Sequence, residues 1–102
     1  MTLDPYIIDT LMPDLVGHDK QPSAFIVFLY LWARARYRPA GAHGPAGKWT
    51  AASLQQMALE SGLSKSAVQQ AIRALKRRRL VHSYQPSATA VPQYLVNAPW
   101  RR

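Results

Sequence analysis

The segment 54–75 (LQQMALESGLSKSAVQQAIRAL) constrains the fold most, because apolar residues recur at helical spacing on both sides of a glycine. Gly62 predicts a tight turn, since glycine readily adopts the left-handed backbone conformation that ends a helix. Four residues earlier, Ala58 is small enough to let two helices approach closely. Six residues after the turn, Val68 is placed to pack the second helix against the first. The segment is therefore expected to form two short helices that cross.

Hydroxyl side chains are expected to start both helices. Thr50 is the predicted N-cap of the first helix, residues 51–61, because its oxygen can accept a bond from an unpaired N–H. Ser64 is the predicted cap of the second helix, residues 65–79. The second helix divides into an apolar stripe and an opposite polar face. The stripe is Val68, Ala71, Ile72 and Leu75, and the polar face is Lys65, Ser66, Gln69, Gln70, Arg73 and Lys76.

Another helix is expected ahead of this pair. An apolar run at residues 24–33 predicts it over residues 24–37, with Ser23 as its N-cap. The run is ten residues long, whereas a membrane span needs about 18 to 20. We therefore expect a buried central helix and no membrane partner.

Two short strands are expected after residue 79. Apolar and polar residues alternate over residues 80–84 and 93–97, which predicts a β-hairpin with a proline-bounded tip. Residues 38–48 are rich in glycine and proline, so a loop is expected there. Trp49 can add a third short strand.

The length of 102 residues predicts one domain. We divide the chain into an acidic and apolar segment 1–22, a folded domain 23–97 and a basic tail 98–102. Segment 1–22 is expected either to dock on the core of its own chain or to cross to a second subunit as a dimerisation element.

The net charge of +8 is distributed unevenly. Residues 1–19 hold four aspartates and no lysine or arginine, whereas residues 20–102 hold all 13 basic side chains against one acid, Glu60. Such a body attracts polyanions, and nucleic acid is the commonest polyanion in a cytoplasm. Basicity also fits a merely solvated surface, so it indicates nucleic-acid binding only weakly.

Residues 23–97, and most specifically residues 50–82, resemble the winged helix-turn-helix domain of bacterial transcriptional regulators. The likeness is to the broad family, including regulators related to plasmid replication initiators. It implies an α+β fold that is mainly α with a small β-hairpin: a three-helix core plus a wing.

The resemblance implies that helix 65–79 enters the major groove of double-stranded DNA. Base edges would then meet Ser66, Gln69, Gln70 and Arg73. Glutamine can bond bidentately to adenine, and arginine to guanine. Phosphate contacts are expected from Lys65, Lys76, Arg77, Arg78, Arg79, Ser64 and Thr50. Because three consecutive arginines sweep most of a helix circumference, only one or two of Arg77, Arg78 and Arg79 are expected to touch phosphate.

The predicted hairpin departs from the family pattern, because residues 81–96 contain no lysine or arginine, only His82. Its contact with DNA therefore stays open, and Arg101 and Arg102 are alternative sources of charge. The leading function is sequence-specific DNA binding by a transcriptional regulator, with a homodimer fitting a palindromic site. The alternatives are a replication or partition initiator, and a winged-helix module that binds protein.

The sequence gives little support for other classes of protein. The chain has no cysteine, which removes disulfides and thiolate chemistry. No nucleophile, base and orienting group can be named with sensible spacing, so an enzyme is not expected. We expect no metal, no cofactor and no small-molecule ligand. The acidic N-terminus does not resemble a signal peptide, and we expect a cytoplasmic protein that joins the nucleoid when bound to DNA.

Overall fold

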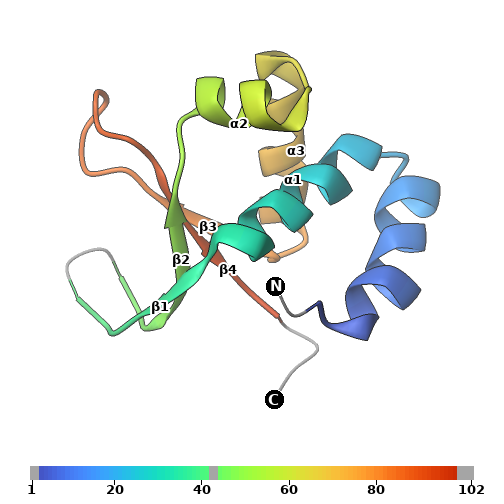
Figure 1. The fold of residues 1–102 in the computed structure, drawn as a ribbon, viewed down its shortest axis with the longest axis horizontal. Helices are drawn as coiled ribbons and strands as arrows, with labels where there is room; N and C mark the ends of the chain where they lie inside the picture. Colours follow the sequence, from blue (N-terminus) through green and yellow to red (C-terminus); the bar gives the residue numbers. More distant parts are fainter. Residues whose placement is uncertain (1–2, 42–43, 99–102) are drawn as a thin grey trace.

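The computed structural model describes residues 3–41 and 44–98. Helices lie against one side of an antiparallel sheet (Figure 1). This confirms the α+β class predicted from the sequence. The elements are η1 (Ile7–Leu11), η2 (Asp14–His18), α1 (Pro22–Arg34), β1 (Arg36–Arg38), β2 (Gly47–Ala51), α2 (Leu54–Ser61), α3 (Lys65–Arg77), β3 (Val81–Tyr84) and β4 (Gln93–Val96).

The sheet is larger than the expected hairpin. Its four strands follow the order β1-β2-β4-β3. The strand expected at Trp49 is therefore present as β2, which pairs with both β1 and β4. Strands β3 and β4 match the predicted hairpin to within one residue at each end.

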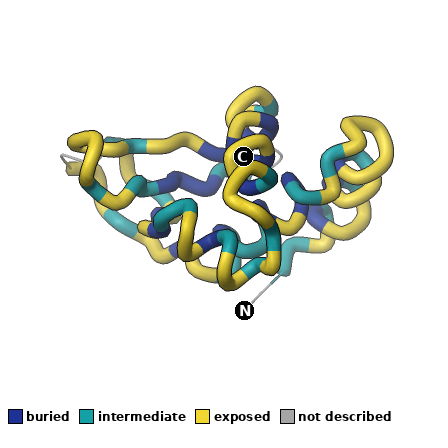
Figure 2. The backbone as a smooth tube through the Cα atoms, turned by 90° about the horizontal axis from the view of Figure 1, so that it is seen from above, coloured by how far each residue is buried: buried dark blue, intermediate teal, exposed yellow. Residues whose placement is uncertain are grey.

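The core lies where α1 and α3 meet each other and the sheet, and Figure 2 shows the buried residues gathered in the interior of the molecule. Phe28 and Leu31 of α1 are fully buried, as are Val68 and Leu75 of α3. The whole predicted stripe of α3 is buried, which confirms its orientation. Burial of these apolar side chains is the main force that fixes α3 on the body of the protein.

Helix α1 differs from its prediction at both ends. Gln21 rather than Ser23 is its N-cap, and Pro22 occupies the first turn, where a missing N–H costs nothing. The helix ends at Arg34 instead of residue 37, because Ala35 is extended and the next three residues pair with β2.

The cap prediction for α2 is wrong. Thr50 is 8% exposed and lies in β2 opposite Tyr94, so strand pairing keeps it extended. Helix α2 starts three residues later than predicted. Its N-cap is Ser53, whose Oγ accepts a hydrogen bond from the Gln56 N–H at 3.0 Å.

The acidic N-terminal segment docks on its own core. Residues 5–18 are helical and include η1 and η2. Ile7 and Leu15 are fully buried and Leu11 is 3% exposed. The residues that the structure describes include no helix of the length and apolarity needed to span a membrane.

Candidate nucleic-acid interface

The turn between α2 and α3 has the geometry that the sequence predicted. Gly62 takes the left-handed conformation, with φ of 81°, and its N–H donates to the Ala58 carbonyl at 3.0 Å. Ser64 caps α3, because its Oγ accepts from the Ala67 N–H at 3.0 Å. These contacts and the buried stripe set the start and the orientation of α3.

The outer face of α3 is a continuous polar surface. Successive residues of an α-helix are about 100° apart, so the polar residues of α3 fall within an arc of about 140°. All of them are exposed: Lys65, Ser66, Gln69, Gln70, Arg73, Lys76 and Arg77. We call these seven residues the α3 face.

The α3 face is free to bind another molecule. Within residues 3–41 and 44–98, its seven side chains make no hydrogen bond or ion pair. Helix α3 contains no acidic residue. The face therefore presents four cations and two side-chain amides that no other described residue engages.

The three consecutive arginines have three different positions. Arg77 belongs to the α3 face, and Arg79 follows the helix with a φ of 59°. Arg78 points away from that face, since its position on the helix lies outside the 140° arc. Its Nη1 lies 2.9 Å from Asp19 Oδ2 and its Nη2 lies 3.4 Å from Asp14 Oδ2. Arg78 is therefore held in two ion pairs within the chain, and Arg77 and Arg79 remain the members of the run expected at phosphate.

Two hydroxyls predicted at phosphates also have structural roles. Thr50 is buried in β2, which corrects its assignment to the interface. Ser64 is exposed, and its Oγ is already the acceptor of the α3 cap. Its backbone stands beside the first-turn N–H groups of α3, where the helix dipole favours an anion.

The body's single acid is held away from the α3 face. Glu60 accepts a hydrogen bond from the Tyr30 hydroxyl, and its Oε1 lies 3.3 Å from Arg34 Nη2. Partial burial, followed by this hydrogen bond, raises the pKa of Tyr30. The Arg34 guanidinium also stacks 4.3 Å from the centre of the Tyr30 ring. The negative charge of Glu60 is thus neutralised by α1.

The β3–β4 hairpin has a neutral surface. His82 and Ser83 are exposed on β3. At the tip, the Gln85 side chain donates to the carbonyls of Ala88 and Ala90 at 3.3 and 2.8 Å. The tip therefore has an ordered backbone but no cation for a phosphate. Arg101 and Arg102, the alternative charges, lie outside the described residues.

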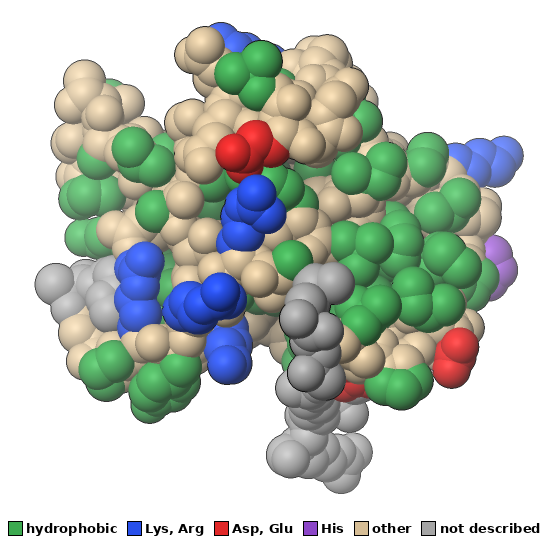
Figure 3. Space-filling model, viewed as in Figure 1, with side chains coloured by type: hydrophobic (Ala, Val, Ile, Leu, Met, Phe, Trp, Pro, Cys, Tyr) green, Lys and Arg blue, Asp and Glu red, His purple; other side chains and the backbone are tan. Residues whose placement is uncertain are grey.

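A basic cluster at the β1 edge of the sheet, opposite β3, was not predicted. Arg36 and Arg38 come from β1 and Lys48 from β2, and lysine and arginine side chains gather there on the view of Figure 3. We call these three residues the β1–β2 cluster. The alternation of arginine with other residues over positions 34–38 was the available signal, since a period of two is typical of a strand.

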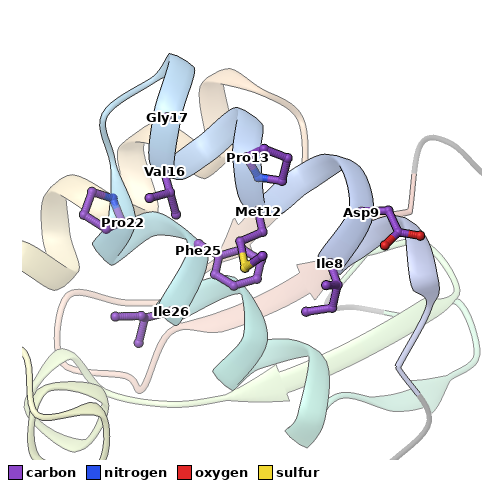
Figure 4. Close-up of a pocket in the computed structure, with 9 residues that line it drawn as sticks. All are labelled: Ile8, Asp9, Met12, Pro13, Val16, Gly17, Pro22, Phe25 and Ile26. Atoms are coloured by element: carbon purple, nitrogen blue, oxygen red, sulfur yellow. The ribbon is translucent and has the colours of Figure 1, made fainter.

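An apolar groove runs between residues 5–18, which we call the N-terminal helix, and α1 (Figures 3 and 4). Ile8, Met12 and Val16 come from the N-terminal helix and are 38–40% exposed. Phe25 and Ile26 come from α1. The stripe at positions 8, 12 and 16 is the face of the N-terminal helix that its own core does not cover.

Among the described residues, no group of three or more histidine and acidic side chains is placed to hold a metal ion. Comparisons with protein-family models, curated proteins and solved structures gave no match for this chain.

Proposed function

We propose that the protein binds double-stranded DNA sequence-specifically by inserting α3 into the major groove, and that it acts as a transcriptional regulator. The observation that carries the proposal is the α3 face. On this one exposed helix face, amide and guanidinium groups that can bond to base edges stand beside lysines that can bind phosphates.

The order of the elements supports a winged helix-turn-helix. Helix α1 and the two strands β1 and β2 precede two helices joined at a glycine turn, and a hairpin follows. The strand β2 joins that hairpin in one sheet by pairing with β4. In this arrangement α3 is the recognition helix and α2 lies behind it.

The α3 face divides naturally into two kinds of contact. Gln69, Gln70 and Arg73 occupy its middle and bear the groups that bond bidentately to adenine or guanine, while Ser66 can donate or accept. Lys65 at one end of the helix and Lys76 and Arg77 at the other are placed for phosphates on the two sides of the groove. Arg79 remains a proposed phosphate contact just beyond the helix.

A protein-binding module is the second candidate. It is favoured by the neutral hairpin and by the apolar groove of the N-terminal helix, because exposed apolar surface of this kind often marks a protein contact. Such a module would bind random DNA only weakly at low salt, whereas the DNA-binding reading predicts a strong salt dependence.

Selection from a random duplex library tests the proposal. The wild type is expected to enrich a defined site, and replacing Gln69 and Arg73 by alanine is expected to lower the preference for that site by about 1 to 3 kcal/mol for each lost bidentate contact. Gln55→Ala, at an exposed glutamine of α2, is the matched control and keeps the preference. Equal losses on selected and random duplexes would contradict base reading by α3.

A further inference from the structure

The β1–β2 cluster stands at the sheet edge farthest from β3. The register places Tyr37 directly opposite Lys48, and Arg36 directly opposite Trp49. Arg36 and Lys48 are exposed, and Tyr37 is 64% exposed. Opposed residues share a face of a sheet, so the charges of the cluster are presented on both faces of this edge.

No carboxylate neutralises the cluster within the described part of the chain. The Arg36 guanidinium donates to the carbonyls of Ala33 and Ala35, at 3.5 and 3.1 Å, and Arg38 donates to the side-chain oxygen of Gln93. These acceptors are uncharged, so they orient the two arginines without cancelling their charge. The cluster therefore keeps three positive charges at the protein surface.

The cluster lies at the opposite end of β2 from the α2–α3 unit. Lys48 is near the start of β2, whereas Ala51 ends the strand shortly before Ser53 caps α2. At about 3.3 Å per residue, Lys48 is about 16 Å along the chain from that cap. The cluster is therefore a surface separate from the start of the α2–α3 unit, at the other end of β2.

We propose that the β1–β2 cluster binds the phosphate backbone of DNA next to the stretch read by α3. The inference rests on the proposed function and adds a second contact surface to it. Charge complementarity selects this partner, because the cluster offers cations and the Tyr37 hydroxyl but no apolar surface apart from that ring. The cluster thus supplies the electrostatic contact that the neutral β3–β4 hairpin lacks.

The test compares two double variants with the same loss of charge. Arg36→Gln with Lys48→Gln removes two cations of the cluster, and Lys20→Gln with Arg34→Gln removes two exposed cations elsewhere. Binding to a 30-base-pair duplex of mixed sequence is measured between 50 and 200 mM salt. Each phosphate contact contributes about 0.9 to the slope of log affinity against log salt.

The cluster variant is expected to lower that slope by about 1.8, so that its affinity falls about 12-fold less than the wild type's across this salt range. The control variant is expected to keep the wild-type slope. Equal slopes for the two variants would overturn the inference. So would aggregation of the cluster variant with unchanged DNA binding, because the arginines would then only protect an edge strand from pairing.

The same titration separates this inference from the proposed function. If the wild type fails to bind duplex DNA at 50 mM salt, both fail. If the wild type binds and the Gln69 and Arg73 substitutions lower its preference for the selected site, the proposed function stands and the slope of the cluster variant alone decides the inference.

Discussion

Arg78 at the end of α3 is paired with Asp19, with 2.9 Å between Nη1 and Oδ2. Asp14 Oδ2 lies 3.4 Å from Nη2 of the same guanidinium. Two acids of the N-terminal segment thus fix that segment to the C-cap residue of α3. The neighbouring Arg77 has no such partner among the described residues and lies on the α3 face, about 100° around the helix from Arg78.

Arg77→Ala and Arg78→Ala should therefore change different properties, DNA binding in the first variant and stability in the second. Arg78→Ala is expected to lower the free energy of unfolding by about 1 kcal/mol, because two partly exposed ion pairs are lost, and to leave the salt slope of DNA binding unchanged. Arg77→Ala is expected to lower that slope by about 0.9 with little change in stability. Urea denaturation and binding titrations on both variants check this. A lowered salt slope in Arg78→Ala would show that Asp14 and Asp19 release it to DNA.

Gly62, the single glycine between the start of α2 and the end of α3, is expected to resist replacement. Its φ of 81° is unfavourable for any residue with a Cβ, although the added atom would meet nothing within 4 Å. Gly62→Ala should therefore cost about 1 kcal/mol from backbone strain alone. Gly17→Ala, inside η2 and also in open space, should instead stabilise by about 0.5 to 1 kcal/mol. Thermal denaturation that shifted both variants in the same direction would contradict this reading.

Alkaline pH should destabilise the protein through Tyr94. Burial raises the pKa of this tyrosine, which is 4% exposed and faces the core. The unfolded chain ionises near pH 10, while the folded chain keeps the neutral phenol to higher pH. Stability is therefore fully present below pH 10 and falls between the two pKa values, by about 1.4 kcal/mol per pH unit for one group.

Tyr94→Phe tests this point by urea denaturation at pH 8, 10 and 11. Its free energy of unfolding should fall less steeply above pH 10 than that of the wild type, relative to each protein's own value at pH 8. Parallel profiles for the two proteins would assign the alkaline loss to other groups.

The sequence predicted those parts of the fold that local patterns determine. Helix α3 was found because the stop of α2 at Gly62 and the cap of α3 at Ser64 bound the turn, and because its buried stripe repeats at helical spacing. The exposure of the α3 face follows from the same pattern. The hairpin was found from simple alternation.

The sequence did not predict features that depend on distant contacts. Thr50 and Ser53 are both hydroxyl residues ahead of a helical pattern, and only the pairing of β2 with β4, more than 40 residues later, makes Ser53 the cap. Strand β1 has no apolar alternation of its own and is held by pairing with β2 across a glycine-rich loop. The engagement of Arg78 by Asp14 and Asp19 likewise joins residues about 60 positions apart.

Site-specific crosslinking tests the central claim most directly, because a chain without cysteine accepts a single labelled position. A photo-crosslinker attached to Ser66→Cys is placed on the α3 face near the start of the helix, and the same reagent on Ile8→Cys reports from the N-terminal helix at an exposure of 38%. With the selected duplex, the label at position 66 is expected to crosslink to a few adjacent bases and the label at position 8 to give no DNA adduct. Crosslinking from position 8 alone, or from neither position while the duplex is bound, would contradict insertion of α3 into the groove.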